Sequence, residues 1–153
     1  MKVSRLLPLS ILLFASAPML WSQSTLTGKI AVNIKITLAT TPPASSIVAC
    51  SAQASVNDPN NTVTEKAAAV ATISGPTATC NMAIPYSWSL LNPSSDIINL
   101  SYTVSISQTI EVPGPDLSSP YVVTLRSTNQ TIGNIQGVPA NGTTTVENIA
   151  ARI

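Results

Sequence analysis

Apolar and polar residues alternate with a period of two along most of the chain that follows residue 25. In the stretch 30–38 every second residue is Ile, Val or Leu, whereas the residues between them are Ala, Asn, Lys and Thr. This pattern is that of a β-strand with one face on the core and the other in water. No stretch after residue 25 sustains the 3.6-residue period of an amphipathic helix. The sequence therefore predicts an all-β protein.

Clusters of Pro, Gly, Asn, Asp and Ser divide the alternation into seven runs of strand length. The runs are 30–38, 48–56, 66–73, 78–90, 98–106, 121–126 and 143–153, and an eighth short strand is expected at 131–135. Seven or eight strands at turn-marked intervals are typical of a single antiparallel β-sandwich of immunoglobulin-like or fibronectin-like type. A small β-barrel is the alternative architecture.

The run 78–90 is the most regular of the seven. Tyr86 and Trp88 share a face with Cys80 in this run, and Tyr102 falls in register with the apolar residues of run 98–106. We therefore expect these three aromatic side chains in the core and not on an exposed sugar-binding platform. Pro85 lies on the opposite face, and proline cannot donate a hydrogen bond to a neighbouring strand. The strand should thus be a sheet edge at Pro85 or carry a bulge there.

The chain has two cysteines, Cys50 and Cys80, and no histidine. In an oxidising compartment, such a pair is most simply one disulfide. A metal site needs more ligands than two thiolates, so we expect neither a metal nor a cofactor.

The first 24 residues have the composition of a signal peptide. Lys2 and Arg5 precede the short apolar stretch 6–14, and small residues at Ser22 and Ser24 permit cleavage before Thr25. Cleavage after Ser22 is an alternative. An uncleaved membrane anchor is disfavoured, because 6–21 is shorter than a bilayer span and contains two prolines. We expect residues 25–153 to form one domain that is secreted, periplasmic or on the cell surface, with no membrane segment after cleavage.

Charged residues make up only 8% of the chain, and the formal net charge is +1. So small a charge offers no basis for binding nucleic acid, and it weakens the usual protection against self-association. The absence of histidine removes the commonest general base, and no Gly-x-Ser-x-Gly motif is present. We therefore expect a protein that is not an enzyme. The remaining catalytic hypothesis pairs carboxylates in space, Asp58 with Glu65 or Asp96 with Asp116.

Two functions fit these expectations. The first is a structural or assembly subunit at the cell surface or in an extracellular matrix, whose early strand, 26–38, completes the sheet of a neighbouring copy or surface protein. In that strand and in its cysteine pair, the chain resembles a chaperone-assembled pilin. The second is a monomeric secreted or periplasmic binding or adhesion module that recognises its ligand with end loops. The candidate loops are 57–64, 92–96 and 113–120.

Overall fold

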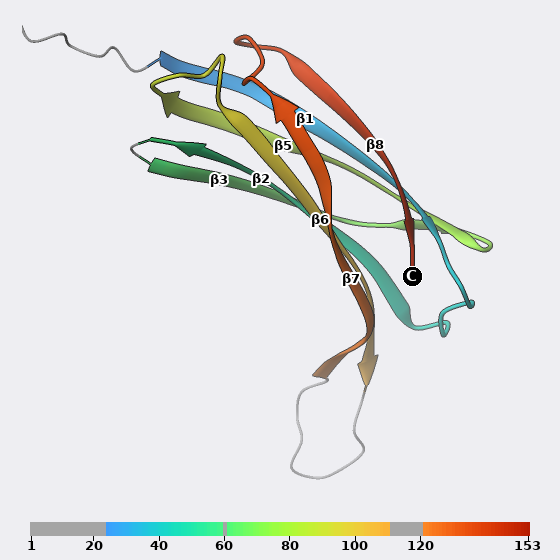
Figure 1. The fold of residues 1–153 in the computed structure, drawn as a ribbon. Coiled ribbons are helices and arrows are strands. Elements are labelled where there is room, and N and C mark those ends of the chain that lie inside the picture. The colour runs from blue at the N-terminus through green and yellow to red at the C-terminus, as the bar shows by residue number, and fades with distance from the viewer. Residues whose placement is uncertain (1–23, 60, 111–120) are drawn as a thin grey trace, which may run out of the picture.

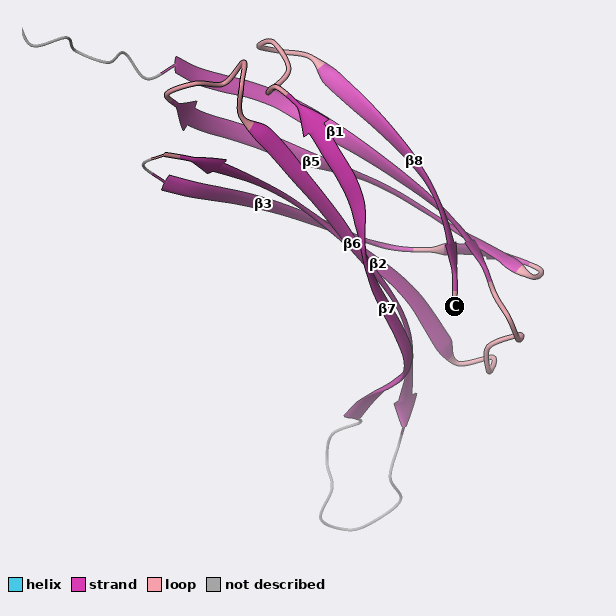
Figure 2. Cartoon of the chain, in the orientation of Figure 1, coloured by secondary structure: helices cyan, strands magenta, loops and turns pink. Residues whose placement is uncertain are grey.

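The computed structural model describes residues 24–59, 61–110 and 121–153. The predicted signal peptide, 1–24, therefore lies outside the described residues except for Ser24. The described residues form eight strands and no helix (Figure 2). The strands are β1 (Ser24–Thr37), β2 (Ser46–Asp58), β3 (Asn61–Val70), β4 (Thr72–Ser74), β5 (Thr77–Leu90), β6 (Ile97–Ile110), β7 (Tyr121–Gln136) and β8 (Thr144–Arg152).

The strands form two separate four-stranded sheets that face each other (Figure 1). One sheet has the order β4-β5-β1-β8 and the other has the order β3-β2-β6-β7. This arrangement confirms the predicted sandwich and excludes the alternative of a closed barrel. Every pairing is antiparallel except that of β8, which runs parallel to β1.

The strand β1 lies inside its sheet, between β5 and β8. Its pairing with β5 is continuous from Ser24 opposite Leu90 to Thr37 opposite Thr77. Because side chains alternate across a strand, every second residue of β1 enters the core. The side chains of Ile30, Val32, Ile34 and Ile36 are all fully buried. The strand is therefore an integral part of this fold.

The run 66–73, predicted as one strand, belongs to two strands in different sheets. The strand β3 starts earlier, at Asn61, and pairs with β2, whereas β4 pairs with β5. Ala71 lies at the crossing point, where its N–H donates to the carbonyl of Val48 at 2.8 Å. The sequence did not reveal the crossing, because β4 is too short to show a pattern of its own, and its three residues are all exposed.

The predicted short strand 131–135 is also not separate. It is the end of β7, which runs without a break from Tyr121 to Gln136. Two irregularities in its register with β6 lie between Leu100 and Ser101 and between Ile106 and Ser107. A bulge inserts a residue and reverses the faces of the residues that follow. The simple alternation is lost for this reason, although the strand continues.

Pro85 lies where β5 is a sheet edge. The short strand β4 covers β5 only at Thr77–Thr79, and opposite Pro85 the sole partner is Lys29 of β1. The register between β1 and β5 contains no shift at this point. Of the two sequence-based alternatives, the sheet edge is therefore the observed one. Because no strand lies on the outer side of Pro85, no neighbouring carbonyl group there needs the N–H donor that proline lacks.

The aromatic side chains fill one part of the core. Trp88 is 2% exposed, and its ring stacks on that of Tyr86 with 4.5 Å between centroids. Tyr102 is also buried, and its hydroxyl donates to Oε1 of Gln130 at 3.1 Å. Tyr86 lies opposite Gly28 on β1, and a side chain at position 28 would meet its ring. Glycine at position 28 thus makes room for this tyrosine.

Candidate functional site

One side of the sandwich is closed by covalent and backbone links between the sheets. Cys50 of β2 and Cys80 of β5 form a disulfide, which confirms the pairing predicted from the sequence. On the same side, the chain crosses from β3 to β4 at Ala71. The two sheets are therefore linked on the side where β3 and β4 are the outer strands, by the disulfide between β2 and β5 and by the crossing of the chain at Ala71.

The opposite side, between β7 and β8, is open, and we call it the open side. Among the described residues, β7 pairs only with β6 and β8 pairs only with β1. Each of these two strands thus has one free edge of backbone N–H and C=O groups. Such an edge is a template for pairing with another chain.

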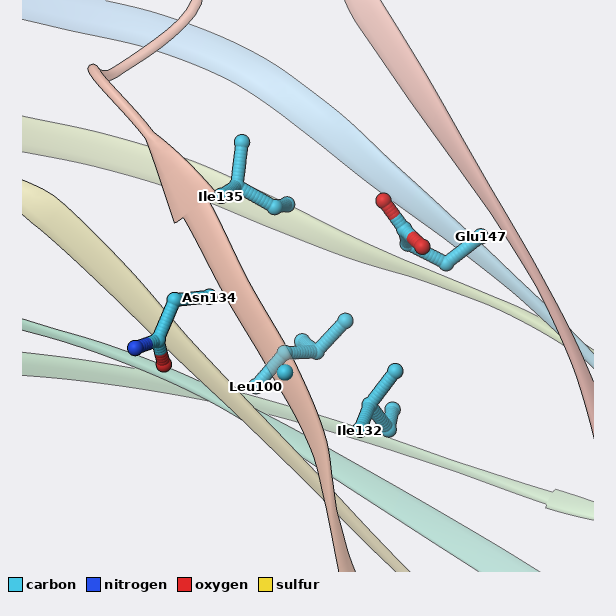
Figure 3. A pocket seen from close by; sticks show the side chains of 6 residues that line it. Leu100, Ile132, Asn134, Ile135 and Glu147 are labelled. Atoms are coloured by element: carbon cyan, nitrogen blue, oxygen red, sulfur yellow. The ribbon is translucent and has the colours of Figure 1, made fainter.

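A pocket of about 140 Å³ lies on the open side between the two sheets. Figure 3 shows Leu100, Ile132 and Ile135 of one sheet directed toward the same space as Glu147 of the other, whereas Asn134 points away from it. The lining thus combines three aliphatic side chains with one carboxyl group, and it also includes Gly133 and Asn134.

Glu147 faces inward because it shares register with the other inward residues of β8. Thr145, Ile149 and Ala151 are less exposed than their neighbours along the strand, as is Glu147. The side chain of Glu147 forms no ion pair with any residue in the described part of the chain. It is therefore an anionic group, partly buried, with room beside it for a cation.

The other two sheet edges carry features that discourage pairing. The free edge of β3 has Glu65 and Lys66 at its centre. On the other sheet, β4 is only three residues long, and Pro85 interrupts the uncovered part of β5. Short strands, charges and proline are common protections of sheet edges. The strand β7 has 16 residues, of which only Arg126 is charged, and the two register shifts in its pairing with β6 are the feature that limits pairing at this edge.

A second pocket, of about 340 Å³, lies at one end of the sandwich. Polar side chains dominate its lining, which consists of Asn57, Ser95, Asp96, Ile97, Asn99 and Asn134. Of the three end loops predicted from the sequence, 92–96 contributes Ser95 and Asp96 to this pocket. The second, 57–64, is not a loop, because residues 57–58 end β2 and residues 61–64 begin β3; it contributes only Asn57. The third, 113–120, lies outside the described residues.

The end pocket adjoins two buried carboxyl groups that the sequence did not place together. Asp58 and Asp96 are 9% and 7% exposed. The N–H of Leu91 donates to Oδ2 of Asp58 at 2.6 Å, whereas Oδ2 of Asp96 is buried without a hydrogen-bond partner. Burial raises the pKa of Asp96, and the nearby negative charge of Asp58 raises it further.

Neither predicted pair of carboxylates is supported. Glu65 lies opposite Ala54, four positions along the ladder from Asp58, whose own partner is Asn61. Asp116 lies outside the described residues. The electrostatic interaction between Asp58 and Asp96 links the end of β2 to the turn before β6, and no sequence pattern links those positions. Glu147 was also missed, although the alternation of β8 places its side chain on the inward face.

Replacing Asp96 with Asn is expected to stabilise the protein at neutral pH and not in acid. A carboxyl group whose pKa is raised by folding binds its proton more tightly in the folded state. Its contribution to the free energy of unfolding is therefore largest below the ordinary pKa of 3.8, and it is lost as the pH rises through the folded-state pKa. Urea denaturation of Asp96→Asn and the wild type over a pH series measures the difference. A difference in unfolding free energy that does not change with pH would contradict the effect.

No family model, no curated protein and no solved structure matches the chain. The described residues include no helix of the length and apolarity that a bilayer crossing demands. They also contain no group of three or more Cys, Asp or Glu side chains placed to hold a metal ion.

Proposed function

We propose that this chain is an exported, non-enzymatic structural subunit that assembles with other copies or with another surface protein. The observation that carries the proposal is the open side of the sandwich, where the edges of β7 and β8 have no partner strand among the described residues and lie beside a pocket between the sheets. The low charge of the chain acts in the same direction, because weak repulsion favours association. The disulfide fits an oxidising compartment outside the cytoplasm.

Donation of the early strand to a neighbour takes a particular form in this fold. Because β1 lies between β5 and β8, a donated β1 must replace the neighbour's own β1. The open side requires no such exchange, since its strand edges are already free. Assembly through the open side is therefore the simpler route.

The end pocket supports a second candidate function, a monomeric secreted or periplasmic module for binding or adhesion. Its lining of Asn, Ser and Asp side chains offers both donors and acceptors to a polar ligand such as a carbohydrate. Its volume of about 340 Å³ falls at the lower end of the range for small-molecule sites. This function requires no association between copies.

Light scattering after size-exclusion chromatography separates the two functions. The full chain, with its own N-terminal segment, is expressed in a host that exports it, and the exported protein is analysed over a series of concentrations. We expect oligomers whose mean mass rises with concentration and which negative-stain microscopy resolves as ordered assemblies. A monomer at every concentration, together with no associated surface protein, would overturn the structural role and favour the binding module.

A further inference from the structure

The sheet β4-β5-β1-β8 turns one face away from the other sheet, and we call it the outer face (Figure 1). Because side chains alternate across a strand, the exposed residues of β1, β5 and β8 project from this face. Three of them are cations, namely Lys29 and Lys35 of β1 and Arg152 of β8. None of the three forms an ion pair with another residue in the described part of the chain.

No carboxylate of the described residues offsets these cations on the outer face. Asp58 and Asp96 are buried, and Glu147 lines the pocket between the sheets. Glu65 belongs to the other sheet, where it lies opposite the buried Ala54. The outer face is therefore positively charged, although the chain as a whole has a formal net charge of only +1. A face of one sign attracts a partner of the opposite sign.

A hollow of about 380 Å³ lies on the outer face, with polar side chains from three strands in its lining. Asn33 and Lys35 of β1 line it together with Thr79 of β5 and Asn148 of β8. Nδ2 of Asn33 donates to Oδ1 of Asn148 at 3.1 Å, which fixes the orientation of both amides. The amide nitrogen of Asn148 can then donate, and the carbonyl oxygen of Asn33 can accept, a hydrogen bond from a ligand. The hollow has the volume of a small-molecule site.

The three cations lie around this hollow and along β1. Lys35 lines the hollow, and its partner on β8 is Ala150. Arg152 is two positions farther along β8, which makes it a diagonal neighbour of Lys35. Lys29 precedes Lys35 by six residues, or roughly 20 Å along the strand. A ligand that contacts all three cations is therefore longer than a single sugar ring and carries negative charge at more than one place.

The chemistry of the outer face favours a carbohydrate over other polyanions. Nucleic-acid bases usually stack on aromatic side chains, whereas Tyr86 and Trp88 of β5 are buried in the core. Attachment to an anionic membrane uses several large apolar side chains or a dense cluster of cations. In the described part of β1, β5 and β8, Val146 is the one large apolar side chain that is exposed. Amides and hydroxyls surround the cations instead, and such groups match the hydroxyls of sugars.

We infer that the outer face binds an acidic polysaccharide, whose carboxylates pair with Lys29, Lys35 and Arg152. Its hydroxyl groups form hydrogen bonds with Asn33 and Asn148 in the hollow. The inference goes beyond the proposed assembly function and does not depend on it, because the outer face and the open side are different surfaces. An assembled chain and a monomer would both present the outer face to the polysaccharide.

Binding of the full exported chain to polygalacturonate, a polymer of carboxylated sugars, tests the inference. Isothermal titration calorimetry should show binding that weakens as the salt concentration rises. The methyl-esterified polymer has the same sugar but no free carboxylates, and it should not bind. Lys35→Gln should weaken binding about threefold, and the triple variant Lys29→Gln/Lys35→Gln/Arg152→Gln about thirtyfold, since each exposed ion pair contributes modestly. Lys66→Gln removes one charge from the opposite face of the sandwich and should leave binding unchanged.

A second variant separates the hollow from the charge. Asn148→Ala leaves every charge in place and should still weaken binding about fivefold, through the lost hydrogen bonds. The inference is wrong if the triple variant binds polygalacturonate as tightly as the wild type, or if the methyl ester binds equally well. Binding to phosphatidylglycerol vesicles or duplex DNA without binding to polygalacturonate would overturn it too. Thermal unfolding establishes that each variant is folded, and the three single variants replace the triple variant if that one unfolds.

Discussion

A chain without β1 is expected not to fold. The strand buries four Ile and Val side chains completely, and each such burial contributes about 1.5–3 kcal/mol, or about 6–12 kcal/mol together. A domain of this size is stable by only about 5–15 kcal/mol. Removal of β1 also leaves the inner edges of β5 and β8 without partners. Circular dichroism and urea denaturation of a chain that begins at residue 39 should therefore show no cooperative transition.

A peptide with the sequence of β1 supplies a control for this experiment. When it is mixed with the chain that begins at residue 39, the cooperative transition should return, because the vacant position between β5 and β8 accepts one strand. A second control chain that begins at residue 24 retains β1 and should fold without the peptide. Cooperative folding of the chain without β1 would contradict the inner position of the strand and would free it for donation to a neighbour.

Removal of the disulfide is expected to lower the free energy of unfolding by about 3–4 kcal/mol. The bond joins Cys50 to Cys80, which are 30 residues apart, and it restricts the unfolded chain by closing this loop. In the folded protein it also joins the two sheets, on the side away from the open edges. The double variant Cys50→Ala/Cys80→Ala, compared with the wild type by urea denaturation, measures the effect.

Reduction of the wild type provides the matched control for that variant. A reducing agent should lower the stability of the wild type nearly to that of the double alanine variant, and it should leave the variant itself unchanged. If removal of the disulfide lowered the free energy of unfolding by less than about 1 kcal/mol, the expectation would be contradicted. The closed loop would then not be restricting the unfolded chain as the prediction assumes.

The sequence predicted the positions and buried faces of the strands better than it predicted which strands pair with each other. The alternation in run 78–90 identified β5 and its buried face almost to the residue, because a side chain's face depends only on the pleat of its own strand. Pro85 similarly indicated a sheet edge or a bulge, because the missing N–H is a local property, and the structure decided for the edge. The bulges of β7 defeated the same reasoning, since an inserted residue breaks the period without ending the strand.

The candidate site depended on contacts that the sequence does not encode locally. The parallel pairing of β8 with β1 joins residues such as Lys29 and Thr144 from opposite ends of the chain. The approach of Asp58 to Asp96 and the open side between β7 and β8 likewise follow from the order of the strands in the two sheets. Many strand orders would bury the same apolar residues, so periodicity alone could not choose among them.

By itself, the amino-acid sequence determined that this protein is all-β, which side of most strands is buried and which cysteines are joined, whereas the choice of a sandwich over a barrel needed the strand order. The tertiary structure alone decided that β1 is an inner strand, that β3 and β4 belong to different sheets, and that one side of the sandwich stays open beside Glu147. The physical reason is the range of the interactions. Burial of alternate side chains is set within a few residues, whereas strand order is set by packing and hydrogen bonds between distant segments, which for β1 and β8 are more than a hundred residues apart.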